Sequence, residues 1–212
     1  MSVKPIFFAL DGKHLDDFKK ELEILKGNIY GVKIGLEMFT SEGPSAVERL
    51  KKDGWNVFLD LKLHDIPNTV QAATISAGNI GADYLTIHIA SGSEALTAAH
   101  QSKSENIKLL GVSSALTSKA FSPSMSERVS HEFLVAKDSN IDGVICPPSE
   151  LNKTKDIFNL LVTPGIRLEN EESHDQRNIT TPEKAIKAGA NYLVMGRSIR
   201  NNINYIVETL KL

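Results

Sequence analysis

Residues 56–67 read NVFLDLKLHDIP, and the interpretation of the whole chain starts from this stretch. Its first four residues form an apolar run that is typical of a buried strand. Because strand side chains alternate between faces, Phe58, Asp60 and Lys62 are predicted to share one face. An acid and an amine therefore meet at a strand end, and Pro67 is suited to the first turn of a following helix.

These charges indicate a pocket rather than a surface salt bridge, because an exposed pair does not need such an apolar strand behind it. Negative charge on Asp60 and Asp65 favours the protonated form of Lys62. We therefore interpret Lys62 as a proton donor. A Schiff-base lysine would instead have to lose its charge before reacting.

The composition is that of an ordinary globular chain, with 212 residues, 41% hydrophobic and 24% charged. A net charge of −2 gives no general attraction to nucleic acid or to an anionic membrane, so any phosphate binding must be local. Cys146 is the only cysteine, which excludes an internal disulfide and favours a reducing compartment; we interpret it as a small buried apolar residue. The sequence shows neither a signal-peptide pattern nor a membrane-spanning apolar run, so we expect a cytoplasmic protein.

Short apolar runs alternate with amphipathic segments along the chain. The runs lie at 5–10, 31–34, 56–59, 84–89, 107–112, 141–145, 160–163 and 192–195, and the segments at 15–25 and 199–210 have helical spacing. Alternation of this kind predicts a parallel sheet covered by helices. We predict one domain, residues 1–212, folded as an α/β protein with a single (β/α)8 TIM barrel. An open doubly wound sheet is the alternative, although no GxGxxG motif follows the first strand.

Charged residues recur at the predicted strand ends, where barrel active sites lie. Asp11, Lys33, Asp60 and Lys62 are expected to point into the barrel as an alternating array of two acids and two amines. Opposite neighbours make burial of four charges tolerable, but apolar residues of similar volume would stabilise the fold as well. Function therefore explains the array better than stability does.

A phosphate site is predicted after the last two strands. Gly196 lets backbone N–H groups approach an anion, and Arg197 can add a bidentate contact. The polar segment 168–181 is long for a loop, and we interpret it as a flap that closes over the ligand with Gln176 reaching in. An exposed linker is the alternative for this segment.

Taken together, the motifs resemble those of the orotidine 5′-phosphate decarboxylase family. The resemblance covers nearly the whole chain and rests on ALD at 9–11, VKIG at 32–35, DLKLHDIPNTV at 60–70, VTPGIR at 162–167, DQ at 175–176 and MGR at 195–197. It implies a barrel homodimer that converts orotidine 5′-monophosphate to UMP and CO2 in the last step of de novo pyrimidine nucleotide synthesis. It also implies that no metal or organic cofactor takes part.

The resemblance further implies a role for each matching residue. The catalytic residues would be Lys62, Asp60, Asp65 and Lys33. Asp60 would lie against the substrate carboxylate, Lys62 would protonate C6, and Asp11 and Lys33 would bind ribose hydroxyls and complete the charged array. The remaining substrate-binding positions would be Asp65, Ile66 and Thr69 in the partner subunit's site, Thr117 at the pyrimidine edge, and Pro164, Arg167, Gln176, Gly196 and Arg197 around the phosphate.

Departures from the family pattern lie in the predicted flap. Leu168 stands where the family usually has proline, and Asn178 stands where a basic residue is frequent. The main alternative is a magnesium-dependent sugar-phosphate decarboxylase or hexulose-phosphate synthase of the same barrel superfamily, and another is a catalytically inactive nucleotide-binding or scaffold barrel. The DIPNTV and TPGIR segments favour the orotidine phosphate enzyme over the first, and the four charged residues argue against the second.

Overall fold

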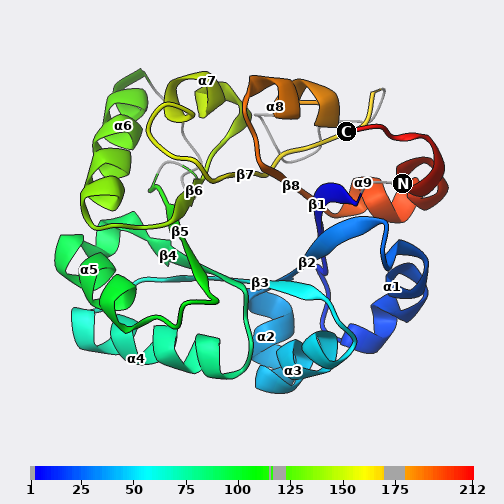
Figure 1. Ribbon diagram of the computed structural model, residues 1–212, viewed down its shortest axis with the longest axis horizontal. Coiled ribbons are helices and arrows are strands. Elements are labelled where there is room, and N and C mark those ends of the chain that lie inside the picture. The colour runs from blue at the N-terminus through cyan, green and yellow to red at the C-terminus, as the bar shows by residue number, and fades with distance from the viewer. Residues whose placement is uncertain (1–2, 115, 117–122, 170–179) are drawn as a thin grey trace.

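The computed structural model describes residues 3–114, 116, 123–169 and 180–212, and within these ranges eight parallel strands close into a barrel (Figure 1). Each strand pairs with the next one in the chain, and β8 pairs with β1. The strands are β1 (Lys4–Ala9), β2 (Ile29–Gly35), β3 (Asn56–Leu63), β4 (Tyr84–His88), β5 (Lys108–Val112), β6 (Gly143–Ile145), β7 (Leu161–Thr163) and β8 (Tyr192–Met195). The predicted (β/α)8 barrel is confirmed, and the pairing of β8 with β1 excludes an open sheet.

Helices surround the barrel and connect its strands (Figure 1). They are α1 (Lys19–Leu25), α2 (Leu36–Glu42), α3 (Pro44–Lys52), α4 (Pro67–Asn79), α5 (Ser93–Ser102), α6 (Pro123–Asp138), α7 (Leu151–Thr154), α8 (Pro182–Ala188) and α9 (Arg197–Asn201), with the short 3₁₀ helices η1 (Leu15–Phe18), η2 (Ile89–Ser91) and η3 (Pro148–Glu150) and the π-helix η4 (Tyr205–Thr209). Pro67 opens α4 as predicted, at a position where its missing N–H has no helical acceptor. In the described part of the chain, no helix has both the length and the apolar character needed to cross a membrane.

The strands alternate as predicted between the barrel interior and the helices. On β1, Phe7 packs inside the barrel, whereas Ile6 and Phe8 belong to the larger core between strands and helices. The interior cluster consists of Phe7, Phe58, Tyr84, Leu110, Val112, Ile145 and Val162. Inward positions further along the same strands therefore point toward the carboxyl-terminal mouth of the barrel.

Aromatic side chains fill the amino-terminal half of the barrel interior. The Phe7 ring lies 5.2–5.4 Å from the rings of Tyr30, Phe58, Tyr84 and Tyr192. The hydroxyls of Tyr30 and Tyr84 are 2.9 Å apart, and burial raises the pKa of Tyr30 to about 12 and raises that of Tyr84 further. Because this aromatic cluster is uncharged, the charged side chains of the barrel interior lie at its carboxyl-terminal end.

Of the two segments predicted to be helical, the structure confirms the first and corrects the second, which is divided. Residues 15–25 are helical throughout, with the 3₁₀ helix η1 followed directly by α1, whereas residues 199–210 are split between α9 and η4. The break falls at Asn202, whose backbone leaves the helical region while its side-chain amide donates to the Ser198 carbonyl at 3.2 Å. Asparagine competes for backbone hydrogen bonds in this way and often ends helices.

Candidate active site

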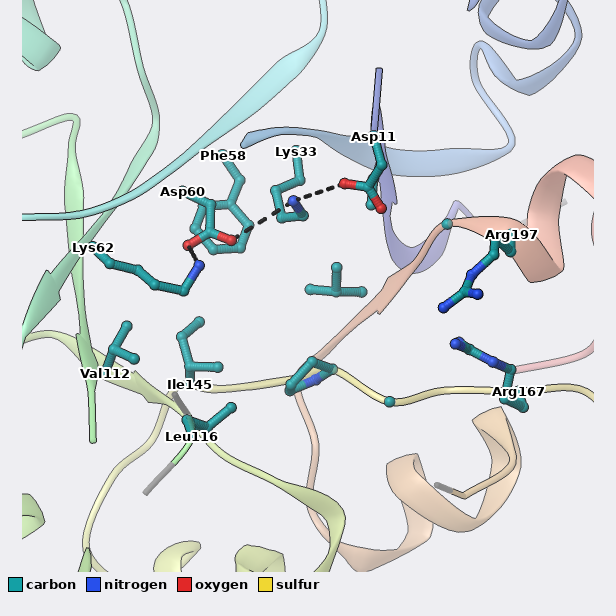
Figure 2. A pocket seen from close by; sticks show the side chains of 15 residues that line it. Asp11, Lys33, Phe58, Asp60, Lys62, Val112, Leu116, Ile145, Arg167 and Arg197 are labelled. Carbon is teal, nitrogen blue, oxygen red and sulfur yellow. Dashed lines mark hydrogen bonds and ion pairs between the residues drawn. The ribbon is translucent and has the colours of Figure 1, made fainter. Parts of the chain in front are cut away.

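A cavity of about 230 Å³ opens at the carboxyl-terminal ends of the strands (Figure 2). One wall is charged and the other is apolar. The lining residues are Ala9, Asp11, Lys33, Phe58, Asp60, Lys62, Val112, Leu116, Ile145, Pro164, Gly165, Arg167, Val194, Gly196 and Arg197. Phe58, Asp60 and Lys62 all line it, which confirms that they share the inward face of β3.

The four predicted charged residues meet along one wall. The Lys62 ammonium lies 2.8 Å from Asp60 Oδ1, and the Lys33 ammonium lies 3.6 Å from Asp60 Oδ2 and 3.4 Å from Asp11 Oδ1. Figure 2 shows the resulting row, which runs from Lys62 through Asp60 and Lys33 to Asp11. Acids and amines alternate along it, so each charge has a neighbour of opposite sign.

Burial differs along this row. The side chains of Lys33 and Asp60 are 11% and 14% exposed, whereas Lys62 is 33% and Asp11 69% exposed. Burial alone would raise the pKa of Asp60, but the charges of Lys33 and Lys62 and hydrogen bonds from Lys62 and Thr86 outweigh it and hold that pKa below its ordinary value of 3.8. The ionised Asp60 carboxylate therefore contributes its full stabilisation of the fold at pH values above its ordinary pKa of 3.8. This contribution is lost as the pH falls through the lower pKa of the folded state.

Two glycines make room for the charged row. A Cβ atom at Gly35 would lie 3.2 Å from the Lys33 ammonium nitrogen, and one at Gly196 would lie 3.2 Å from Asp11 Oδ2. Both distances are shorter than ordinary van der Waals contact. Gly35 at the end of β2 and Gly196 directly after β8 thus let the charged groups approach the backbone.

Two arginines lie at the other end of the cavity. In Figure 2, Arg167 and Arg197 face each other away from Lys62. Arg167 is 7% exposed, and its Nη1 donates to the Ile166 carbonyl at 2.8 Å. Because α9 spans only five residues, the guanidinium groups provide more attraction for an anion than the helix end does.

The structure separates the predicted site residues into three groups. Asp11, Lys33, Asp60, Lys62, Pro164, Arg167, Gly196 and Arg197 line the cavity. Asp65, Ile66 and Thr69 are exposed and do not line it, and the Asp65 carboxylate accepts a hydrogen bond from the Ile66 N–H at 2.7 Å. Thr117 and Gln176 lie outside the described residues, as does most of the predicted flap 168–181. At the base of this segment, the Arg167 N–H donates to the Thr180 carbonyl at 3.0 Å.

His64 and His88 stack on each other beside the barrel mouth, with ring centroids 5.1 Å apart. Burial, and then the neighbouring His64, lower the pKa of His88, which favours its neutral imidazole. Among the described residues, no group of three or more His, Cys, Asp or Glu side chains is arranged to hold a metal ion.

Several residues that line or support the cavity were not predicted from the sequence. Val112, Leu116 and Ile145 form the apolar wall, and the inward alternation of β5 and β6 is the signal that could have identified Val112 and Ile145. Glu132 on α6 is buried and accepts hydrogen bonds from the Ser114 N–H, at 2.8 Å, and from its hydroxyl. This contact anchors the turn after β5 to α6, and no local sequence pattern predicts it because the two residues are far apart in the chain.

Cys146 is fully buried at the end of β6, as predicted, and its thiol lies 3.6 Å from the Pro147 carbonyl. Burial raises the pKa of Cys146 to about 12, so about one thiol in 10⁴ is ionised at pH 8. We expect the folded protein to leave Ellman's reagent unchanged at pH 8 and the denatured protein to consume one equivalent. Rapid stoichiometric labelling of the folded protein would contradict this, and a Cys146→Ala variant supplies the blank.

Comparison with known proteins places this geometry in a family. Residues 4–209 match the profile described as the orotidine 5′-phosphate decarboxylase / HUMPS family. The chain belongs to this family. Curated members named orotidine 5′-phosphate decarboxylase include one from Bacillus cereus (strain AH187), 35% identical, and one from Prochlorococcus marinus (strain MIT 9515), 36% identical; each alignment covers 92% of this chain and 89% of the relative.

Solved structures of the orotidine 5′-phosphate decarboxylase family also share the fold. The crystal structure of orotidine 5′-phosphate decarboxylase from Lactobacillus acidophilus superposes with a TM-score of 0.76 at 32% identity, covering 92% of this chain and 91% of that one. The resemblance expected from the sequence motifs is therefore confirmed at the level of the family.

Proposed function

We propose that this protein decarboxylates orotidine 5′-monophosphate to UMP and CO2 in pyrimidine nucleotide synthesis, without a metal or organic cofactor. The observation that carries the proposal is the alternating row from Asp11 to Lys62 in a cavity whose other end holds two arginines. The names of the relatives support the same reaction. A nucleoside monophosphate carries its phosphate at a distance from its base. This matches a cavity that has two arginines at one end and Lys62 at the other.

In the proposed reaction, Lys62 acts on the pyrimidine ring. The bond between C6 and the carboxylate breaks, its electron pair stays on C6, and neutral CO2 leaves. The Lys62 ammonium stabilises this carbanion and then transfers its proton to C6, after which the lysine regains a proton from solvent. Asp60, whose pKa is depressed, is an anion beside the substrate carboxylate, and that repulsion ends when CO2 departs.

The other lining residues would bind the rest of the nucleotide. Asp11 and Lys33 would hydrogen-bond the ribose hydroxyls, and Arg167 and Arg197 would bind the phosphate beside Pro164 and Gly196. Thr117 and Gln176 remain proposed contacts to the pyrimidine edge and the phosphate. Phosphate binding is remote from the broken bond, so its free energy can organise the charged groups.

An absorbance assay with purified protein and orotidine 5′-monophosphate tests this function. We expect the absorbance of the substrate to fall to that of UMP, with the same rate after dialysis against EDTA. No decarboxylation at any protein concentration would refute the proposal. Loss of activity in EDTA that magnesium restores would favour the metal-dependent sugar-phosphate enzymes of the superfamily instead.

We also propose a homodimer in which the turn after β3 completes the partner's site. Asp65 and Thr69 are exposed beside Ile66, whose surface is 66% exposed, so this turn presents an acid and an apolar side chain outside its own cavity. A second copy of the chain would bury both. The proposal further treats residues 1–212 as one domain and the buried Cys146 thiol as typical of a cytoplasmic protein.

Mixing two inactive variants tests the shared site. Lys62→Ala and Asp65→Ala are each expected to be nearly inactive, whereas an equimolar mixture that has exchanged subunits should recover about one quarter of the parental activity. Random exchange makes half of the dimers mixed, and each mixed dimer regains one intact site of two. If Asp65 served its own chain, every site in the mixture would keep a defect and no activity would return.

A further inference from the structure

The pairing between β3 and β4 is interrupted where the charged residues lie. Leu59 pairs with Leu85, and the next aligned pair is Leu63 with Ile87, so residues 60–62 bulge out of the ladder. Lys62 adopts a φ of 51°, and among the described residues only Asn140 shares this positive φ without being glycine. Asparagine tolerates the left-handed region through its short polar side chain, whereas lysine does not. The neighbouring structure must therefore hold the bulge.

The hydroxyl of Thr86 occupies the gap in the ladder. Thr86 is an inward residue of β4 and is completely buried. The Lys62 N–H donates to Thr86 Oγ1 at 2.8 Å, and that hydroxyl donates to Asp60 Oδ1 at 2.9 Å. One side chain thus replaces a strand partner for the Lys62 backbone and orients the Asp60 carboxylate.

The same carboxylate oxygen of Asp60 also accepts from the Lys62 ammonium at 2.8 Å. Backbone, hydroxyl, carboxylate and ammonium therefore form a closed ring of contacts between Lys62, Thr86 and Asp60. Because the hydroxyl has a single proton and already accepts from the Lys62 N–H, that proton is directed to Asp60. The ring couples the conformation of the bulge to the position of the ammonium.

We propose that Thr86 is a positioning residue for the decarboxylation, setting the backbone of Lys62 and the carboxylate of Asp60 without touching the substrate. This inference rests on the proposed function of the site. Thr86 does not line the cavity, so its replacement removes no group that would contact the nucleotide directly. Misplacement of reacting groups by about 1 Å can cost about 10²-fold in rate.

Three variants separate positioning from folding. Thr86→Val keeps the shape but removes the hydroxyl, and Thr86→Ser keeps the hydroxyl. Thr74→Val is the matched control, because Thr74 is also completely buried and its hydroxyl donates to the Val70 carbonyl at 2.8 Å, within α4. Thermal unfolding shows which variants are folded. If Thr86→Val does not fold, Thr86→Cys replaces it, since a thiol of similar size is a weak donor and acceptor.

We expect Thr86→Val to lower kcat about 10²-fold while KM stays within about threefold, because the arginines that would bind phosphate are intact. Thr86→Ser should restore kcat to within about fivefold of the parent, and Thr74→Val should match the parent. A Thr86→Val enzyme with parental kcat, or a serine variant as slow as the valine variant, would overturn the proposal.

A measurement that needs no turnover separates this inference from the proposed function. Burial pushes the pKa of Asp60 up, whereas Lys33, Lys62 and the Thr86 hydrogen bond hold it down. Carbon-13 NMR titration of the Asp60 carboxyl should give a higher pKa in Thr86→Val than in the parent or Thr86→Ser. An equal pKa in all three would overturn the role of Thr86 even in a protein that does not decarboxylate the nucleotide.

Discussion

Replacement of Lys62 by alanine is expected to lower kcat for orotidine 5′-monophosphate by at least about 10⁴-fold. In the proposed reaction this ammonium both offsets the charge that develops at C6 and supplies the proton. Loss of a general acid typically costs about 10²- to 10⁴-fold, and loss of a fixed electrostatic donor about 10²- to 10³-fold. Absorbance assays at saturating substrate measure the change in kcat directly.

Lys51 offers a matched control for this variant. Its side chain is 30% exposed, against 33% for Lys62, and its ammonium pairs with Asp83 at 2.6 Å, outside the cavity. Lys51→Ala removes an ion pair of similar exposure, so we expect kcat within about twofold of the parent. Both variants should keep the parental circular dichroism spectrum. A Lys62→Ala enzyme within about tenfold of the parent would show that another group protonates C6.

Replacement of Arg197 by alanine is expected to lower kcat/KM by about 10²- to 10⁴-fold, because one side of the proposed phosphate site is lost. Charge-assisted contacts from a guanidinium to a phosphate are among the stronger hydrogen bonds in proteins. Their free energy also organises the charged row in the proposed reaction, so kcat should fall together with the affinity. Initial rates across a range of substrate concentrations separate the two effects.

Arg200 lies on the same short helix and serves as the control. Its guanidinium stacks over the Phe18 ring at 5.0 Å and pairs with Glu21 at 3.4 Å, and it does not line the cavity. Arg200→Ala should therefore keep kcat/KM within about twofold of the parent. If Arg197→Ala behaved in the same way, the phosphate would have to bind elsewhere.

The sequence was sufficient to predict the barrel and the charged row, because both follow from alternation along single strands. The inward face of β1 predicts the direction of Asp11, and the inward face of β3 predicts that of Asp60. Each depends only on neighbours two residues away. The strand pairs then bring Lys33 and Asp60 together without any further information.

Features that depend on pairing between distant segments could not be predicted in this way. The bulge at Lys62 exists because residues 60–62 of β3 lie opposite the single residue Thr86 of β4. The Thr86 hydroxyl fills the resulting gap. The hydrogen bond from Ser114 to Glu132 likewise joins the turn after β5 to α6. The split of residues 199–210 arose from backbone competition at Asn202, which apolar spacing does not report.

The central claim is that Lys62 faces C6 of a pyrimidine nucleotide whose phosphate lies at the two arginines. A crystal structure of the protein with bound UMP tests it most directly. We predict the Lys62 ammonium within about 3.5 Å of C6 and the phosphate between Arg167 and Arg197. A nucleotide bound outside this cavity, or a metal ion seated between Asp11 and Asp60, would contradict the account.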